Sequence, residues 1–110
     1  MTTTTIAVPG AQIEVRNVIF IAGRGTVVVG HVQRGTARVG QLTAPLVLGE
    51  TQGRRLEVSA VERLSSMEAR GPGVGIIFRN PPHLDDLKRA LPPGSILALE
   101  EPGGAGGRIT

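Results

Sequence analysis

The sequence predicts an all-β fold, a small closed barrel of six antiparallel strands with one short helical turn before the last strand. Glycine and proline are frequent, with 16 and 8 copies in 110 residues, and they divide the chain into strand-length segments. Several of these segments alternate apolar and polar side chains, as half-buried strands do. No segment shows the regular strand and helix alternation that predicts a parallel sheet.

The length of the chain is sufficient for one domain with one modest core. Aromatic residues make up only 2% of the sequence, so the core is expected to consist of aliphatic side chains, with Phe20 and Phe78 as its largest members. The absence of cysteine excludes disulfides and thiolate metal sites. No apolar run approaches the ~20 residues of a membrane helix. We therefore expect a soluble, cytoplasmic protein without membrane contact.

Three regions are expected along the chain. Residues 1–12 are threonine-rich at their start and contain the turn signal Pro9-Gly10, which predicts a flexible lead-in. Residues 13–102 are expected to form the barrel. Residues 103–110 are rich in glycine and predict a flexible tail.

The first strand is predicted over residues 14–22, where both faces are apolar. Val18 and Phe20 share one face, and Ile19 and Ile21 share the other. A strand that is apolar on both faces is covered on both sides or lies at an interface. Ile19 and Ile21 are therefore the candidate residues of a protein interface.

A glycine turn at residues 23–25 is expected to lead into a second strand over residues 26–33. Val27 and Val29 alternate with their neighbours and are predicted to face the core. A third strand is predicted over residues 42–48.

Pro45 lies inside this third strand and predicts an edge or a bulge, because proline has no amide hydrogen for the ladder. A polar loop over residues 49–53 and a strand over residues 55–63 are expected to follow. A further loop is predicted over residues 65–73, which end in Gly-Pro-Gly.

The last third of the chain predicts a strand over residues 74–79, a short helix over 83–91 and a final strand over 95–99. Acidic residues near the start of the helix and basic residues near its end suit the helix dipole. Three leucines of this helix share one face: Leu84, Leu87 and Leu91.

Two segments carry a family resemblance. Residues 23–35 read Gly-Arg-Gly-Thr-Val-Val-Val-Gly-His-Val-Gln-Arg-Gly, and a Val-Gly turn follows at residues 39–40. Residues 71–80 read Gly-Pro-Gly-Val-Gly-Ile-Ile-Phe-Arg-Asn, and acidic-basic and Gly-Ser-Ile-Leu-Ala segments follow them. In order and spacing the chain resembles, over about residues 14–102, the second domain of elongation factor Tu and related translational GTPases. The resemblance implies a six-stranded barrel.

In that family the domain packs against a GTPase domain, helps hold the aminoacyl end of tRNA and touches small-subunit ribosomal RNA. The resemblance therefore implies a translation protein that binds RNA or the ribosome. This chain departs from the pattern in three places. It has no phosphate-binding loop, Arg16 and Asn17 stand where elongation factor Tu has an acidic pair, and His31 stands where arginine is common.

Arginine supplies the candidate RNA contacts, because its guanidinium group binds phosphate in a bidentate manner. Arg24 lies between two glycines in a turn and is expected to be exposed. Four others would form a phosphate-binding stripe if adjacent hairpins align: Arg34, Arg38, Arg54 and Arg55. The competing interpretation is ordinary surface charge, since the formal net charge is only +3.

No catalytic arrangement is found. His31 and His83 lack the spacing of metal ligands, and Asp85 and Asp86 are explained by the start of a helix. The serines have no nucleophile-elbow context. We therefore expect no enzyme activity, no metal and no cofactor.

Two hypotheses of function remain. The first is a non-enzymatic binding module that contacts RNA, the ribosome or another translation-associated partner. The alternative is a protein-interaction or structural module that binds a separate GTPase domain or a second copy of itself through Ile19 and Ile21.

Overall fold

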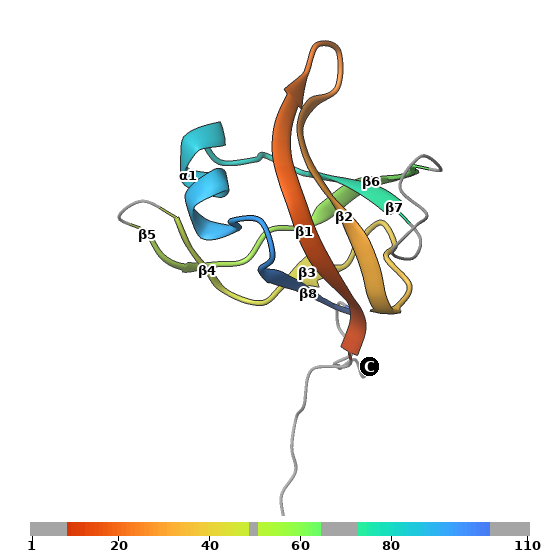
Figure 1. The fold of residues 1–110 in the computed structure, drawn as a ribbon. Helices are drawn as coiled ribbons and strands as arrows, with labels where there is room; N and C mark the ends of the chain where they lie inside the picture. The colour runs from red at the N-terminus through yellow and green to blue at the C-terminus, as the bar shows by residue number, and fades with distance from the viewer. Residues whose placement is uncertain (1–8, 49–50, 65–72, 102–110) are drawn as a thin grey trace, which may run out of the picture.

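The computed structural model describes residues 9–48, 51–64 and 73–101, and these residues form mainly β-strands. Figure 1 shows a long hairpin crossing the molecule, with shorter strands around it and one helix beside it. The elements are β1 (Pro9–Ile21), β2 (Gly25–Gly35), β3 (Leu42–Thr43), β4 (Leu46–Leu48), β5 (Thr51–Arg54), β6 (Val58–Arg63), β7 (Gly73–Phe78), α1 (Leu84–Ala90) and β8 (Ile96–Glu100).

Six of the strands form one antiparallel sheet in the order β3-β8-β1-β2-β7-β6. The long strands β1 and β2 occupy its middle, and β4 and β5 form a separate two-stranded sheet. The predicted all-β class, the antiparallel pairing and the single helix near the last strand are therefore confirmed.

β3 and β6 are the first and last strands of this order. Backbone hydrogen bonds also connect the segment around β3 with the segment at the start of β6. The amide of Val58, at the start of β6, donates to the carbonyl of Gln41 over 2.8 Å, and Gly40 donates to the carbonyl of Val58 over 2.9 Å. Thr43 of β3 donates to the carbonyl of Leu56 over 2.9 Å. The segment that contains β3 is thus bonded to β8 on one side and to the segment leading into β6 on the other.

The core lies between the strands and is covered at one end by α1. Ile13, Val15 and Val18 of β1 are all nearly or fully buried in it. Val15 and Val18 can share a face at a spacing of three because the β1–β2 register shifts between Val15 and Asn17. Leu87 of α1 and Leu91, which directly follows the helix, belong to the same cluster, in agreement with their predicted common face.

The first strand begins earlier than the sequence predicts. β1 starts at Pro9, so residues 9–12, expected in the flexible lead-in, lie in the sheet. Proline is tolerated at the first residue of a strand. Gly10 permits close packing there, because a Cβ atom at this position would overlap with the side chain of Gln41. Pro9-Gly10 is therefore the start of a strand and not a turn.

Phe78 is buried as predicted, with 2% of its surface exposed, but the prediction for Phe20 is wrong. Phe20 is 65% exposed and Ile21 is 40% exposed. The physical reason is the length of the hairpin. β8 pairs with β1 as far as Glu14 and β7 pairs with β2 only from Val27, so the end of the hairpin extends past the core.

The prediction for β2 is confirmed for Val27, which is buried, but it does not include Val28. Val28, with no exposed surface, belongs to the main core cluster, whereas Val29 is half-buried. Val27 is buried but lies on the opposite face of the strand from Val28. A Cβ atom on Gly75 would lie 3.0 Å from the Val27 side chain, so this glycine leaves room for the valine.

Proline interrupts the predicted third strand. β3 ends at Thr43 and β4 begins at Leu46, because Pro45 cannot donate to a ladder. Residues 51–53, predicted as loop, belong to β5, and the next strand begins at Val58 instead of residue 55. The predictions for residues 1–8, 49–50, 65–72 and 103–110 lie outside the described part of the chain.

The core placement predicts the cost of truncating Ile76, which has no exposed surface. We expect Ile76→Ala to lower the free energy of unfolding by about 2–5 kcal/mol, measured by urea denaturation, because it leaves a cavity. Val47→Ala is the matched control, since Val47 is 69% exposed and surface changes usually cost within about 0.5 kcal/mol. Equal losses for the two variants would contradict the core described above.

Candidate functional site

The end of the β1–β2 hairpin projects beyond the other labelled elements (Figure 1). We call residues 20–26 the hairpin tip. Phe20 pairs with Thr26 and Ile21 pairs with Gly25, and within the described chain these residues have no third strand beside them. The tip is therefore a two-stranded extension of the sheet.

A tight turn closes the tip. The amide of Arg24 donates to the carbonyl of Ile21 over 2.9 Å. Gly23, the third residue of this turn, has a φ of +84°, as in a type II turn, and Gly25 has a φ of +92°. Both angles favour glycine, so the glycines predicted to form this turn hold its shape.

The tip carries an apolar surface on both faces. Phe20 is largely exposed on one face, and Ile21 is exposed on the other, next to the half-buried Ile19. Full burial of an apolar side chain of this size is worth roughly 1.5–3 kcal/mol relative to exposure. A partner that covered Phe20 and Ile21 would recover part of this free energy.

Most of the five predicted RNA-binding arginines are bonded to other groups of the protein. Three of them form exposed or partly exposed ion pairs with glutamates: Arg24 with Glu62, Arg38 with Glu101 and Arg55 with Glu100. Exposed pairs of this kind contribute little to stability. They do, however, place a negative charge beside each guanidinium group, which weakens its attraction for phosphate.

Arg54 and Arg55 are adjacent in sequence but bind different parts of the molecule. Arg54 donates from Nη2 to the carbonyl of Asn80 over 2.7 Å. Arg55 donates from Nε to the carbonyl of Thr43 over 2.9 Å. Each side chain is thus held by backbone oxygen, and the two do not act as a pair.

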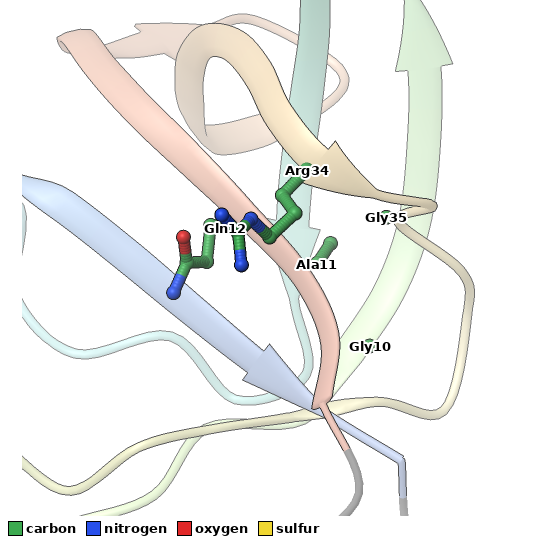
Figure 2. Close-up of a pocket in the computed structure, with 5 residues that line it drawn as sticks. All are labelled: Gly10, Ala11, Gln12, Arg34 and Gly35. Atoms are coloured by element: carbon green, nitrogen blue, oxygen red, sulfur yellow. The ribbon is translucent and has the colours of Figure 1, made fainter.

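Arg34 has a different environment, in a cleft at the base of the hairpin. Figure 2 shows its side chain beside that of Gln12, with Ala11 on the other side of β1. Gly10 and Gly35 complete the lining of the cleft, whose volume is about 310 Å³. No ion pair within the described residues involves Arg34. An anion could accept hydrogen bonds from its guanidinium group and from the side-chain amide of Gln12.

A polar cluster that the sequence does not predict lies near this cleft, centred on the buried side chain of Gln41. Its Nε2 donates to the carbonyl of Thr36 and to Oε2 of Glu101, both over 2.9 Å. Its Oε1 accepts from the amide of Arg38 over 2.8 Å. The side chain therefore ties the segment after β2 to the end of β8. A single glutamine in a polar stretch gives no sequence signal of this role.

The same contacts affect the acidity of Glu101. The hydrogen bond from Gln41, followed by that from Arg38, lowers the pKa of the Glu101 carboxyl below its ordinary value. Both bonds favour the ionised form. The cluster is consequently an arrangement that stabilises the fold and holds the carboxylate charged.

The described residues contain no group of three or more His, Cys, Asp or Glu side chains able to hold a metal ion. His31 is buried in β2, and His83 caps α1 by accepting from the amide of Asp85. Ser59 and Ser95 donate to backbone carbonyls, those of Ile77 and Pro92. Ser65 and Ser66 lie outside the described part. Within the described segments, no helix has the length and apolar character needed to cross a membrane.

No protein-family model matches the chain. The likeness to the translation-factor domain therefore stays a prediction from sequence order and spacing.

The Glu101 contacts predict a pH dependence of stability. The pKa is lower in the folded state than in the unfolded state, whose ordinary value is 4.5. The stabilising contribution is therefore present above that value and is lost as the pH falls through the folded-state pKa. We expect Glu101→Gln to unfold with a weaker dependence on pH in this acidic window than wild type, measured by urea denaturation at several pH values. Parallel pH profiles would contradict the assigned contacts.

Proposed function

We propose that the protein is a non-enzymatic protein-interaction module and that the hairpin tip is its binding surface. The observation that carries this proposal is the exposure of Phe20 and Ile21 on an extension of the sheet that two glycines hold in a tight turn. Aromatic residues are enriched at the centres of protein interfaces. Only two aromatic residues occur in the chain, and one of them lies on this surface.

We further propose that the sheet closes into a six-stranded barrel of the translation-factor type. The hydrogen bonds of Gly40, Gln41 and Thr43 with residues 56–58 support closure, because they connect the two ends of the strand order. Closure would remove open edges from the body of the domain and leave the hairpin tip as its main projection. The barrel is then a rigid support for one contact surface.

RNA or ribosome binding is the second candidate. Exposed aromatic rings can stack on unpaired bases, and Phe20 offers such a ring. However, of the five predicted RNA-binding arginines only Arg34 and Arg54 form no ion pair within the described residues, and Arg34 pairs in register with Gln12 at the base of the hairpin, far along the strands from Phe20. Arg24, at the tip itself, is already paired with Glu62. The charge arrangement therefore favours a protein partner.

The proposal predicts which variants lose their partners. We expect chemical cross-linking in cell lysate, followed by mass spectrometry, to recover binding proteins with wild type and not with Phe20→Ser. Ribonuclease treatment is expected to leave this binding intact. Val47→Ser serves as the control, since Val47 is a similarly exposed apolar residue on β4. Equal recovery with Phe20→Ser and wild type would refute the tip as the binding surface.

The RNA candidate predicts a different result. Fluorescence anisotropy with a single-stranded RNA should then show binding that falls steeply as salt rises, because neutralised phosphates release counterions. Phe20→Ser and Arg34→Ala should both weaken it. We expect no such binding at low salt, and salt-sensitive binding would favour the RNA candidate over the protein partner.

A further inference from the structure

One edge of β1 is open in the part of the hairpin nearest the tip, from residue 16 to residue 21. On that side, Val15 is the last residue with backbone partners: its amide donates to Ser95 over 2.8 Å, and its carbonyl accepts from Gly94 over 2.7 Å. From residue 16 to residue 21, β2 is the only strand in the described chain that pairs with β1. A free strand edge of this kind can accept a further strand.

Two hydrogen bonds show which backbone groups face the open edge. The carbonyl of Ile21 accepts from Arg24 inside the hairpin, so Ile21 is directed toward β2. The amide of Val18 donates to Oδ1 of its neighbour Asn17 over 2.8 Å and is directed away from β2. Backbone groups alternate in direction along an antiparallel strand. The amide and carbonyl of Phe20 therefore also face the open edge, where no described residue bonds to them.

The chemistry of this edge suits a second copy of the same chain. Residues 17–23 read Asn-Val-Ile-Phe-Ile-Ala-Gly and contain no charge and no proline. A two-fold axis brings identical surfaces together, so a run of charges would repel itself, whereas this segment is uncharged between Arg16 and Arg24, and Arg24 is paired with Glu62. A second copy also presents the same unbonded amide and carbonyl of Phe20. The edge is thus complementary to itself in both hydrogen bonding and polarity.

The neighbouring loop limits how the two edges can align. Gly94 and Ser95 occupy the edge beside Val15, so a partner strand cannot pair with the residues of β1 that precede residue 16. An antiparallel alignment centred on Phe20 places residue 22 of one copy opposite residue 18 of the other, which avoids this loop. It also places the two Phe20 residues opposite each other and Ile19 opposite Ile21. Aromatic and β-branched cross-strand pairs are favourable in sheets.

We propose that two copies of this chain associate through the hairpin tips, by antiparallel pairing of the β1 edges around a two-fold axis at Phe20. This inference rests on the proposed function, because it names the protein partner that the tip binds.

A cysteine introduced at the axis tests the geometry, since the chain has no native cysteine. In a hydrogen-bonded antiparallel pair, opposite Cα atoms are about 5.5 Å apart, which lies within the range of disulfides. We expect purified Phe20→Cys to form a disulfide-linked dimer rapidly under mild oxidation. Val47→Cys, which is also exposed, is expected to form it only slowly. Equal rates for the two variants would overturn the proposed axis.

Sedimentation velocity of the purified full chain tests the association itself. We expect a dimer fraction of wild type that rises with concentration, a monomeric Phe20→Glu and a Val47→Glu that behaves as wild type. At concentrations where wild type is monomeric, the melting temperature of Phe20→Glu should match that of wild type, because the side chain is exposed in the single chain. A wild type that remains monomeric, or a Phe20→Glu that still dimerises, would refute the proposal.

The two proposals fail in different ways. If wild type is monomeric but Phe20→Ser still loses its cross-linked proteins in lysate, the self-association is wrong and the interaction module stands. If those cross-links do not depend on Phe20, the tip is not a binding surface and both proposals are wrong.

Discussion

The structure depends on the pairing of β1 with β2, because every other strand of the large sheet is attached to this hairpin. β8 and then β3 extend the sheet from β1, and β7 and then β6 extend it from β2. The close approach of the two strands requires small residues. A Cβ atom on Gly30 would overlap with the carbonyl of Glu14, and one on Gly35 would overlap with that of Gly10. The glycines inside the hairpin are therefore structural requirements as well as turn formers.

The register shift after Val15 gives this hairpin two different halves. On the N-terminal side of the shift, β1 pairs with β2 and with β8, and its apolar residues are buried in the core. On the C-terminal side of the shift, β1 pairs with β2 alone, and the apolar side chains of Phe20 and Ile21 are exposed. One continuous strand thus stabilises the domain at one end and carries the proposed binding surface at the other. This division connects the fold to the proposed function.

The charges of the molecule support the same view. Arginine is abundant, but glutamates lie beside Arg24, Arg38 and Arg55, and backbone carbonyl oxygens hold Arg54. Three of the five candidate arginines are therefore neutralised by local ion pairs, which weakens their attraction for phosphate. Arg34 and its cleft remain a separate feature at the opposite end of the hairpin.

The sequence by itself determined the fold class, the glycine turn at the tip and the helix with its buried Leu87, because local conformational preferences and short-range periodicity specify these features. It also singled out the strand with two apolar faces. Only the tertiary structure decided that Phe20 is exposed and that Val28 and not Val27 belongs to the main core cluster. It also decided that glutamates distant in sequence neutralise three of the five candidate arginines. These outcomes depend on where neighbouring strands end and where a bulge shifts the register, and such long-range relations leave no periodic pattern in the chain.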